Sequence, residues 1–108
     1  MIRITLYRCE GNWTGYRAEG HSGYAEEGSD IVCAAVSVLG ATCINSLESV
    51  CGIIPVITEN RSGLLAFHLS QPSEHDAQVL MGALKQGLTD IEEQYPENIK
   101  ISILERRK

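Results

Sequence analysis

The sequence predicts an α+β fold in which two helices pack on one face of a mixed, mostly antiparallel sheet. Short segments with alternating apolar and polar residues indicate strands, and two longer segments with apolar residues three or four positions apart indicate helices. Along the chain these segments follow the order β-β-α-β-β-α-β. The chain has 108 residues, of which 44% are hydrophobic, which is enough for one core and too little for two. We therefore expect residues 1–108 to form a single domain.

A β-hairpin is predicted at the start of the chain. Residues 1–8 and residues 13–19 both alternate apolar with polar side chains, which is typical of strands with one buried face. Between them, Glu10, Gly11 and Asn12 favour a tight turn. The two strands are therefore expected to pair with each other.

The pattern becomes helical at Ser29 or Asp30 and remains so to about Cys51. Either of the first two residues can cap the helix, and Gly52 is placed to end it. The predicted inward-facing stripe consists of Val32, Val36, Leu39, Cys43, Leu47 and Val50.

The second half of the chain predicts another hairpin, another helix and a last strand. Residues 53–59 and 64–69 form the hairpin around a turn at residues 60–63. Residues 72 and 73 open the second helix, which Pro96 ends. Its predicted buried stripe consists of Ala77, Leu80, Met81, Leu84, Leu88, Ile91 and Tyr95. The last strand is predicted from the alternation of Ile99, Ile101 and Ile103.

The acidic composition argues against several kinds of partner. The formal net charge is −5, whereas a nucleic-acid-binding surface needs a basic patch. Residues 1–8 lack the uninterrupted apolar run of a signal peptide, and no segment is expected to reach bilayer-spanning length. We therefore predict a cytoplasmic protein that binds neither nucleic acid nor membranes.

Most of the cysteine and histidine residues lack the surroundings of a reactive or metal-binding site. The cysteines have no CxxC pairing and no zinc-site spacing, so neither disulfides nor a metal or other cofactor is predicted. Cys43 and Cys51 are expected to fill the core or its edge, and His68 and His75 to be structural or solvent-facing. Four aromatic residues either complete the core or line an apolar subsite: Tyr7, Trp13, Tyr16 and Tyr24.

Cys33 and His21 form a candidate nucleophile and base. Cys33 lies in the first turn of the first predicted helix, and His21 lies shortly before that helix. Cysteine attacks as the thiolate, and the backbone N–H groups and dipole at a helix N-terminus favour negative charge. A nearby imidazole could take the thiol proton, and N–H groups at the helix start could stabilise an oxyanion. A small buried cysteine and an ordinary surface histidine are the alternative.

Two further residues could support this pair. Asp30, Cys33, Ser37 and Gly40 are three or four positions apart, so they share one small, polar helix face that could admit a peptide backbone or a loop. Asp30 could orient His21 or cap the helix. Ser37 could hydrogen-bond a substrate or a carbonyl of its own helix.

Three glycines punctuate the segment that carries the histidine. Gly20, Gly23 and Gly28 predict a flexible loop, because glycine has the widest choice of backbone conformation. Such a loop could cover a substrate or simply connect a strand to a helix.

The motif that joins these residues resembles the signature of the ribosomal-processing cysteine proteases, small bacterial enzymes. It comprises His21, Gly23, Gly28, Asp30 and the run from Val32 to Ser37. The length and the order of elements resemble the family throughout, although only the segment from His21 to Ser37 is specific.

The resemblance implies a protease that removes a short N-terminal extension from the twenty-seventh protein of the large ribosomal subunit. It also implies that His21 and Cys33 are the catalytic pair, that Asp30 and Ser37 lie near them, and that the enzyme is a homodimer. Two other interpretations of the residues stay open: a thiol-based redox sensor, and a non-catalytic ribosome-associated binding module.

Overall fold

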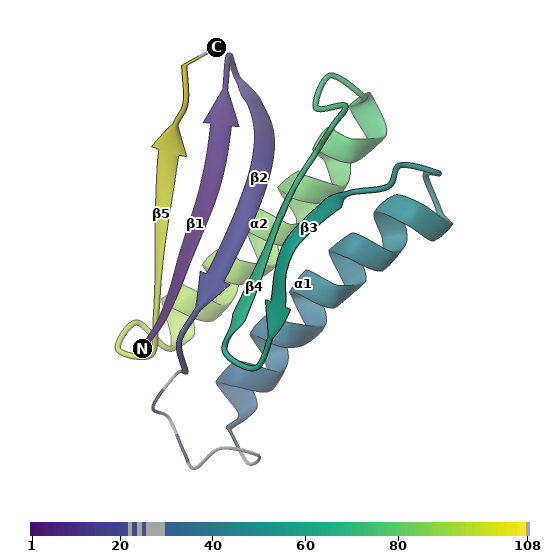
Figure 1. The fold of residues 1–108 in the computed structure, drawn as a ribbon. Helices are drawn as coiled ribbons and strands as arrows, with labels where there is room; N and C mark the ends of the chain where they lie inside the picture. The colour runs from purple at the N-terminus through teal and green to yellow at the C-terminus, as the bar shows by residue number, and fades with distance from the viewer. Residues whose placement is uncertain (22, 24, 26–29, 108) are drawn as a thin grey trace.

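Two helices cover one face of an open, five-stranded sheet (Figure 1). The computed structural model describes residues 1–21, 23, 25 and 30–107. Over these residues the elements are β1 (Ile2–Cys9), β2 (Asn12–Glu19), α1 (Ile31–Ser49), β3 (Val56–Arg61), β4 (Leu64–His68), α2 (His75–Gln94) and β5 (Ile99–Glu105). The α+β class and the predicted order of elements are confirmed.

The strand order in the sheet is β3-β4-β2-β1-β5. The pairs β1–β2, β2–β4 and β3–β4 are antiparallel, while β1 and β5 are parallel. The parallel pair places β5 beside the first strand of the chain, after α2 has crossed the face of the sheet. The sheet is therefore mixed and mostly antiparallel, as the sequence predicts.

Several predicted boundaries shift. The α1 helix ends at Ser49, and Val50 is 76% exposed, so its place on the buried stripe was predicted wrongly. The backbone turns away at Gly52, whose φ of +69° favours glycine and lets its N–H donate to the Glu48 carbonyl. The α2 helix begins at His75 instead of residue 72 or 73, because Glu74 still has an extended backbone.

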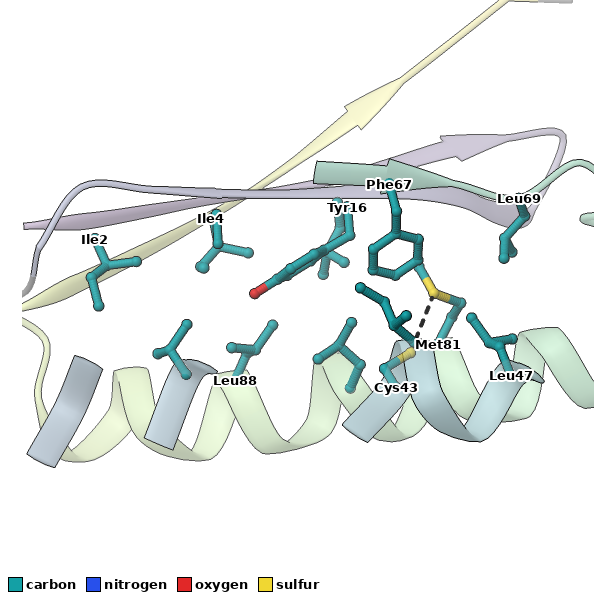
Figure 2. Packing of buried hydrophobic residues seen from close by; sticks show 14 of the residues in the cluster. Ile2, Ile4, Tyr16, Cys43, Leu47, Phe67, Leu69, Met81 and Leu88 are labelled. Carbon is teal, nitrogen blue, oxygen red and sulfur yellow. Dashed lines mark hydrogen bonds between the residues drawn. The ribbon is translucent and has the colours of Figure 1, made fainter. Parts of the chain in front are cut away.

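The core lies between the sheet and the two helices (Figure 2). Side chains from the inner face of the sheet meet side chains from both helices, and the rings of Tyr16 and Phe67 lie with centroids 5.5 Å apart. Burying each large apolar side chain contributes roughly 1.5–3 kcal/mol, so this layer holds the helices against the sheet. The largest fully buried side chains are Tyr16, Ile4, Leu6, Leu47, Met81, Leu88, Ile99 and Val32.

The α1 helix is long and strongly apolar. Its 19 residues are long and apolar enough to cross a membrane by length and composition, so the expectation that no segment reaches this length is wrong. A helix that fills a protein core meets the same criteria. In this fold one side of α1 packs on the core, with Val32, Val36, Gly40, Cys43, Ile44 and Leu47 buried, while Ile31 and Val38 are exposed.

Candidate active site

The structure brings Cys33 and His21 together. Cys33 lies in the first turn of α1, and its Sγ atom is 3.8 Å from Nδ1 of His21. His21 follows the end of β2 and is exposed, while Cys33 is half-buried. Because sulfur is a large atom, 3.8 Å is within hydrogen-bonding distance for a thiol and an imidazole nitrogen. Proton transfer between the two groups therefore needs little movement.

Asp30 caps α1. Its Oδ1 atom accepts hydrogen bonds from the backbone N–H groups of Val32 and Cys33, each at 3.0 Å, and the residue is only 6% exposed. The capping role predicted for Asp30 is therefore confirmed. Because its carboxylate accepts from two successive N–H groups, one of them that of Cys33, it stabilises the first turn of α1.

The same cap overturns one expectation about the oxyanion. The N–H groups of Val32 and Cys33 donate to the Asp30 side chain, and that of Ala34 donates to the Asp30 carbonyl at 3.1 Å. An oxyanion hole needs donors that point at the developing charge. These three groups at the helix start do not meet that requirement in this structure, so the expectation is wrong for them.

The turn between β3 and β4 positions His21 from the other side. The N–H of Gly20 donates to the carbonyl of Gly63 at 2.8 Å, which ties the residue before His21 to this turn. Gly63 has a φ of +77°, and a Cβ atom there would lie 3.0 Å from Nε2 of His21. The imidazole thus lies between Cys33 and the backbone of Gly63.

A pocket of about 590 Å³ opens beside this pair. One wall is α1, which contributes Ser37, and the opposite wall is the β3–β4 hairpin. Ser37 is exposed one turn beyond Cys33, as the sequence predicts. Gly40 is buried, and a Cβ there would lie 3.0 Å from Leu65, so its predicted place on an open polar face was wrong: α1 touches β4 at that point.

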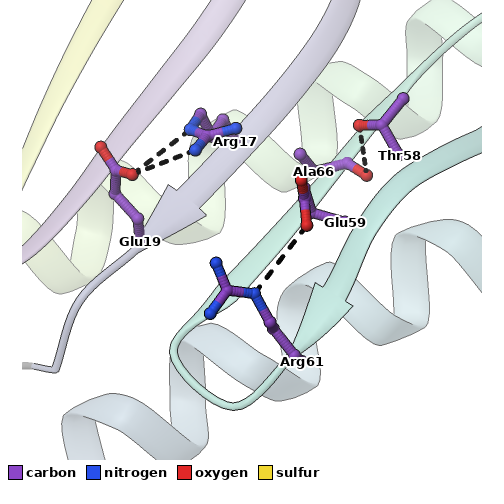
Figure 3. Close-up of polar contacts among 6 residues, drawn as sticks. All are labelled: Arg17, Glu19, Thr58, Glu59, Arg61 and Ala66. Atoms are coloured by element: carbon purple, nitrogen blue, oxygen red, sulfur yellow. Dashed lines mark hydrogen bonds and ion pairs between the residues drawn. The ribbon is translucent and has the colours of Figure 1, made fainter.

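A β-bulge shapes the hairpin wall. The pairing register shifts between Ile57 and Glu59, so Thr58 is an extra residue whose hydroxyl donates to the carbonyl of Ala66 at 3.3 Å (Figure 3). Side chains in a strand alternate between faces, and one extra residue therefore brings Ile57 and Asn60 to the same side. Both line the pocket.

The exposed ion pairs drawn in Figure 3 contribute little to stability: Arg17 with Glu19, and Arg61 with Glu59.

The remaining candidates lie away from the pair or outside the described residues. Cys43 is buried, with its Sγ 3.9 Å from Sδ of Met81, and burial raises its pKa to about 11. His68 and His75 are exposed. Gly28 and Tyr24 lie outside the described residues. Across residues 1–21, 23, 25 and 30–107, no cluster of three or more His, Cys, Asp or Glu side chains could hold a metal ion.

Two parts of the site were missed by sequence reasoning. The β3–β4 turn was identified as a turn, but nothing local connects Gly63 with His21. Tyr16 was left open between core and subsite, and the structure gives it both places, since it is buried and also lines the pocket. Alternation along β2 shows that Tyr16 faces inward, yet the strand order is needed to bring it near the pair.

Comparison with known proteins gives consistent matches over nearly the whole chain. The family model described as cysteine protease Prp matches residues 1–100. The ribosomal processing cysteine protease Prp of Staphylococcus aureus (strain Mu50 / ATCC 700699) is 30% identical over 105 residues, which cover 94% of this chain and 98% of that protein.

Two solved structures share the fold. One shows the ribosomal processing protease Prp of S. aureus with a covalently linked product peptide; it has a TM-score of 0.90 and 28% identity, and the match covers 95% of this chain and 99% of that one. The other is SMU.848 from Streptococcus mutans, with a TM-score of 0.87 and 32% identity; the match covers 98% of this chain and 96% of that one.

Proposed function

This chain belongs to the cysteine protease Prp family, and on that premise we propose that it removes the N-terminal extension of the twenty-seventh protein of the large ribosomal subunit. The observation that carries the proposal is the 3.8 Å approach of the Cys33 thiol to Nδ1 of His21, at the edge of a pocket of about 590 Å³. The covalently linked product peptide of the S. aureus relative supports a covalent route.

His21 and Cys33 are the proposed catalytic pair. Nδ1 of His21 accepts the thiol proton, which requires the neutral ring to carry its own proton on Nε2. The thiolate attacks the scissile carbonyl, the carbon–nitrogen bond breaks, and the imidazolium returns its proton to the leaving amine. Water then hydrolyses the thioester, which releases the second product and regenerates the thiol. No cofactor takes part in this scheme.

Asp30 and Ser37 are proposed to support the pair. Asp30 positions Cys33 through the helix cap, and Ser37 has an exposed hydroxyl on the pocket wall that can hydrogen-bond the substrate. Gly20 and Gly23 are proposed to give the segment around His21 conformational freedom when the peptide enters; Gly28, the third glycine of this prediction, lies outside the described residues. Since the N–H groups of Val32, Cys33 and Ala34 donate to Asp30, we propose that the oxyanion is stabilised by other donors at the pocket.

The wider setting follows the family resemblance. We propose that residues 1–108 act as one protease domain, as a cytoplasmic homodimer that binds neither nucleic acid nor membranes. The net charge of −5 supports a protein substrate with a basic end over a nucleic acid. Light scattering coupled to size-exclusion chromatography measures the dimer directly.

The decisive experiment incubates the extended ribosomal protein with the enzyme and identifies the products by mass spectrometry. We expect one cut with the wild type and intact substrate with Cys33→Ala, while the variant keeps its folded circular dichroism spectrum. A variant that still cuts would remove Cys33 from the mechanism. If the wild type does not cut and Cys33 instead forms a reversible sulfenic acid, the redox interpretation is correct.

A further inference from the structure

The Tyr16 hydroxyl is a buried polar atom without a partner. Tyr16 is 1% exposed, and within the described part of the chain its hydroxyl makes no hydrogen bond. An unpartnered hydroxyl in a core costs free energy, because it loses its hydrogen bonds to water and gains none from the protein. A phenylalanine would fill the same space without this cost.

The hydroxyl lies at the inner end of the pocket that holds His21 and Cys33. Figure 2 shows the phenol extending from the sheet between the two layers, with its oxygen directed toward the Ile2 side of the core. Tyr16 and Ile2 both line that pocket. The residue of α1 next to the Tyr16 hydroxyl is Gly40. A Cβ atom added at Gly40 would lie 3.6 Å from the hydroxyl oxygen. Because Gly40 has no side chain, α1 presents only backbone at this point and offers the hydroxyl no side-chain partner.

Most of the buried residues that line the pocket are apolar; the exception is Asp30, whose carboxylate caps α1. Ser37, Asn45 and Asn60 are exposed. The apolar lining residues that are buried or half-buried include Ile2, Ala18, Val36, Ile44, Leu64 and Leu65. A ligand group that reaches the hydroxyl must therefore be largely apolar, with a hydrogen-bonding atom at its tip.

We propose that the Tyr16 hydroxyl determines specificity by hydrogen-bonding the uncharged polar tip of a substrate side chain that enters between α1 and the β3–β4 hairpin. The inference rests on the proposed function. A peptide backbone does not fit so deep, because α1 and β4 approach closely where a Gly40 Cβ would lie 3.0 Å from Leu65 Cδ2. A single side chain enters by moving Leu65, which is half-buried.

The chemistry of the site selects a neutral tip. Burial raises the pKa of Tyr16 well above its ordinary value, so the phenol stays protonated and can both donate and accept. A charged tip would be buried among apolar side chains, which is costly. Because the hydroxyl is already removed from water in the free protein, its hydrogen bond to the ligand carries a smaller desolvation cost than usual.

The test compares two enzymes on two sets of peptides. Peptides spanning the cleavage site carry tyrosine or phenylalanine in turn at each position before the cut, and wild type and Tyr16→Phe are assayed on every pair. At one position the wild type should prefer tyrosine about tenfold in kcat/KM, chiefly through KM, and Tyr16→Phe should lose that preference. Without peptide, the melting temperature of Tyr16→Phe should be equal or higher.

Gly40→Ala provides a second variant. It leaves the hydroxyl in place but puts a methyl group beside it and against Leu65, so it should reduce the same preference. The inference is overturned if Tyr16→Phe keeps the wild-type ratio at every position, because the hydroxyl would then be only a defect of the core. If the wild type cuts none of the peptides and not the ribosomal protein either, the proposed function fails and this inference fails with it.

Discussion

Cys33 and Cys43 lie on the same helix and have opposite surroundings. Cys33 is half-buried at the edge of a pocket, with an imidazole 3.8 Å from its sulfur. Cys43 is 6% exposed between the helices, with its sulfur 3.9 Å from Sδ of Met81. The same side chain is thus a candidate nucleophile at one end of α1 and a core residue in its middle.

The difference shows that tertiary surroundings govern how a thiol on this helix behaves. At Cys43, burial disfavours the charged form and raises the pKa to about 11, so the thiol remains neutral in ordinary buffers. At Cys33, the Asp30 cap fixes the first turn and the Gly63 backbone limits where His21 can lie. Three separate parts of the chain thus determine the surroundings of this thiol.

The largest expected effect is on thiol alkylation. Iodoacetamide should modify Cys33 in the folded protein at least ~100 times faster than Cys43, because Cys43 reacts only after the structure opens. Peptide mapping by mass spectrometry over time measures both rates in one sample. Equal rates would mean that the two sites do not differ in accessibility, and the comparison would break down.

Gly63→Ala tests the support of His21 from the β3–β4 turn. The added Cβ would lie 3.0 Å from Nε2 of His21, so the ring must shift from the position it holds between Gly63 and Cys33, and kcat/KM should fall roughly 10- to 100-fold. Gly52→Ala is the matched control, since Gly52 also has a positive φ, +69°, but no atom stands within 4 Å of its added Cβ.

Both glycine variants should lose similar stability in urea denaturation, because both place alanine in a left-handed backbone conformation. Only Gly63→Ala should lose activity beyond what its stability explains. If Gly52→Ala loses as much activity, the contact with His21 is not the cause.

Substitutions of Asp30 separate capping from chemistry. Asp30→Asn keeps a good cap and should weaken cleavage less than Cys33→Ala or His21→Ala, whereas Asp30→Ala should also lower the free energy of unfolding by about 1 kcal/mol. Cleavage kinetics and urea denaturation of the four variants give both quantities. An equal loss of activity in Asp30→Asn and in the two pair variants would assign Asp30 a role beyond holding the helix.

The smallest effect on cleavage is expected at Cys43. Cys43→Ala should leave cleavage unchanged and cost about 1–2 kcal/mol of stability through the lost packing. The pKa of Cys43 is raised from 9.0 to about 11, so its protonated thiol stabilises the fold fully below pH 9, and this contribution is lost as the pH rises through 11. Denaturation between pH 7 and 10.5 should therefore show a steeper alkaline loss in wild type than in Cys43→Ala. Parallel curves would contradict the burial of this thiol.

The sequence by itself determined the features that depend on neighbours along the chain. Alternation and helical spacing predict the order of the elements, and the sequence narrows the cap of the first helix to Ser29 or Asp30, of which the structure shows Asp30. These predictions succeed because backbone pairing within a helix, side-chain alternation in a strand and capping all act over a few residues.

Only the tertiary structure decided what depends on strand order and packing. It sets Gly63 against His21, leaves Val50 exposed, buries Gly40 against Leu65 and, among the residues that the structure describes, gives the Tyr16 hydroxyl no partner. Each of these outcomes depends on residues that are separated from the one concerned by whole elements of the chain. Local periodicity states which face of an element is apolar, but it carries no information about which distant residue will cover that face.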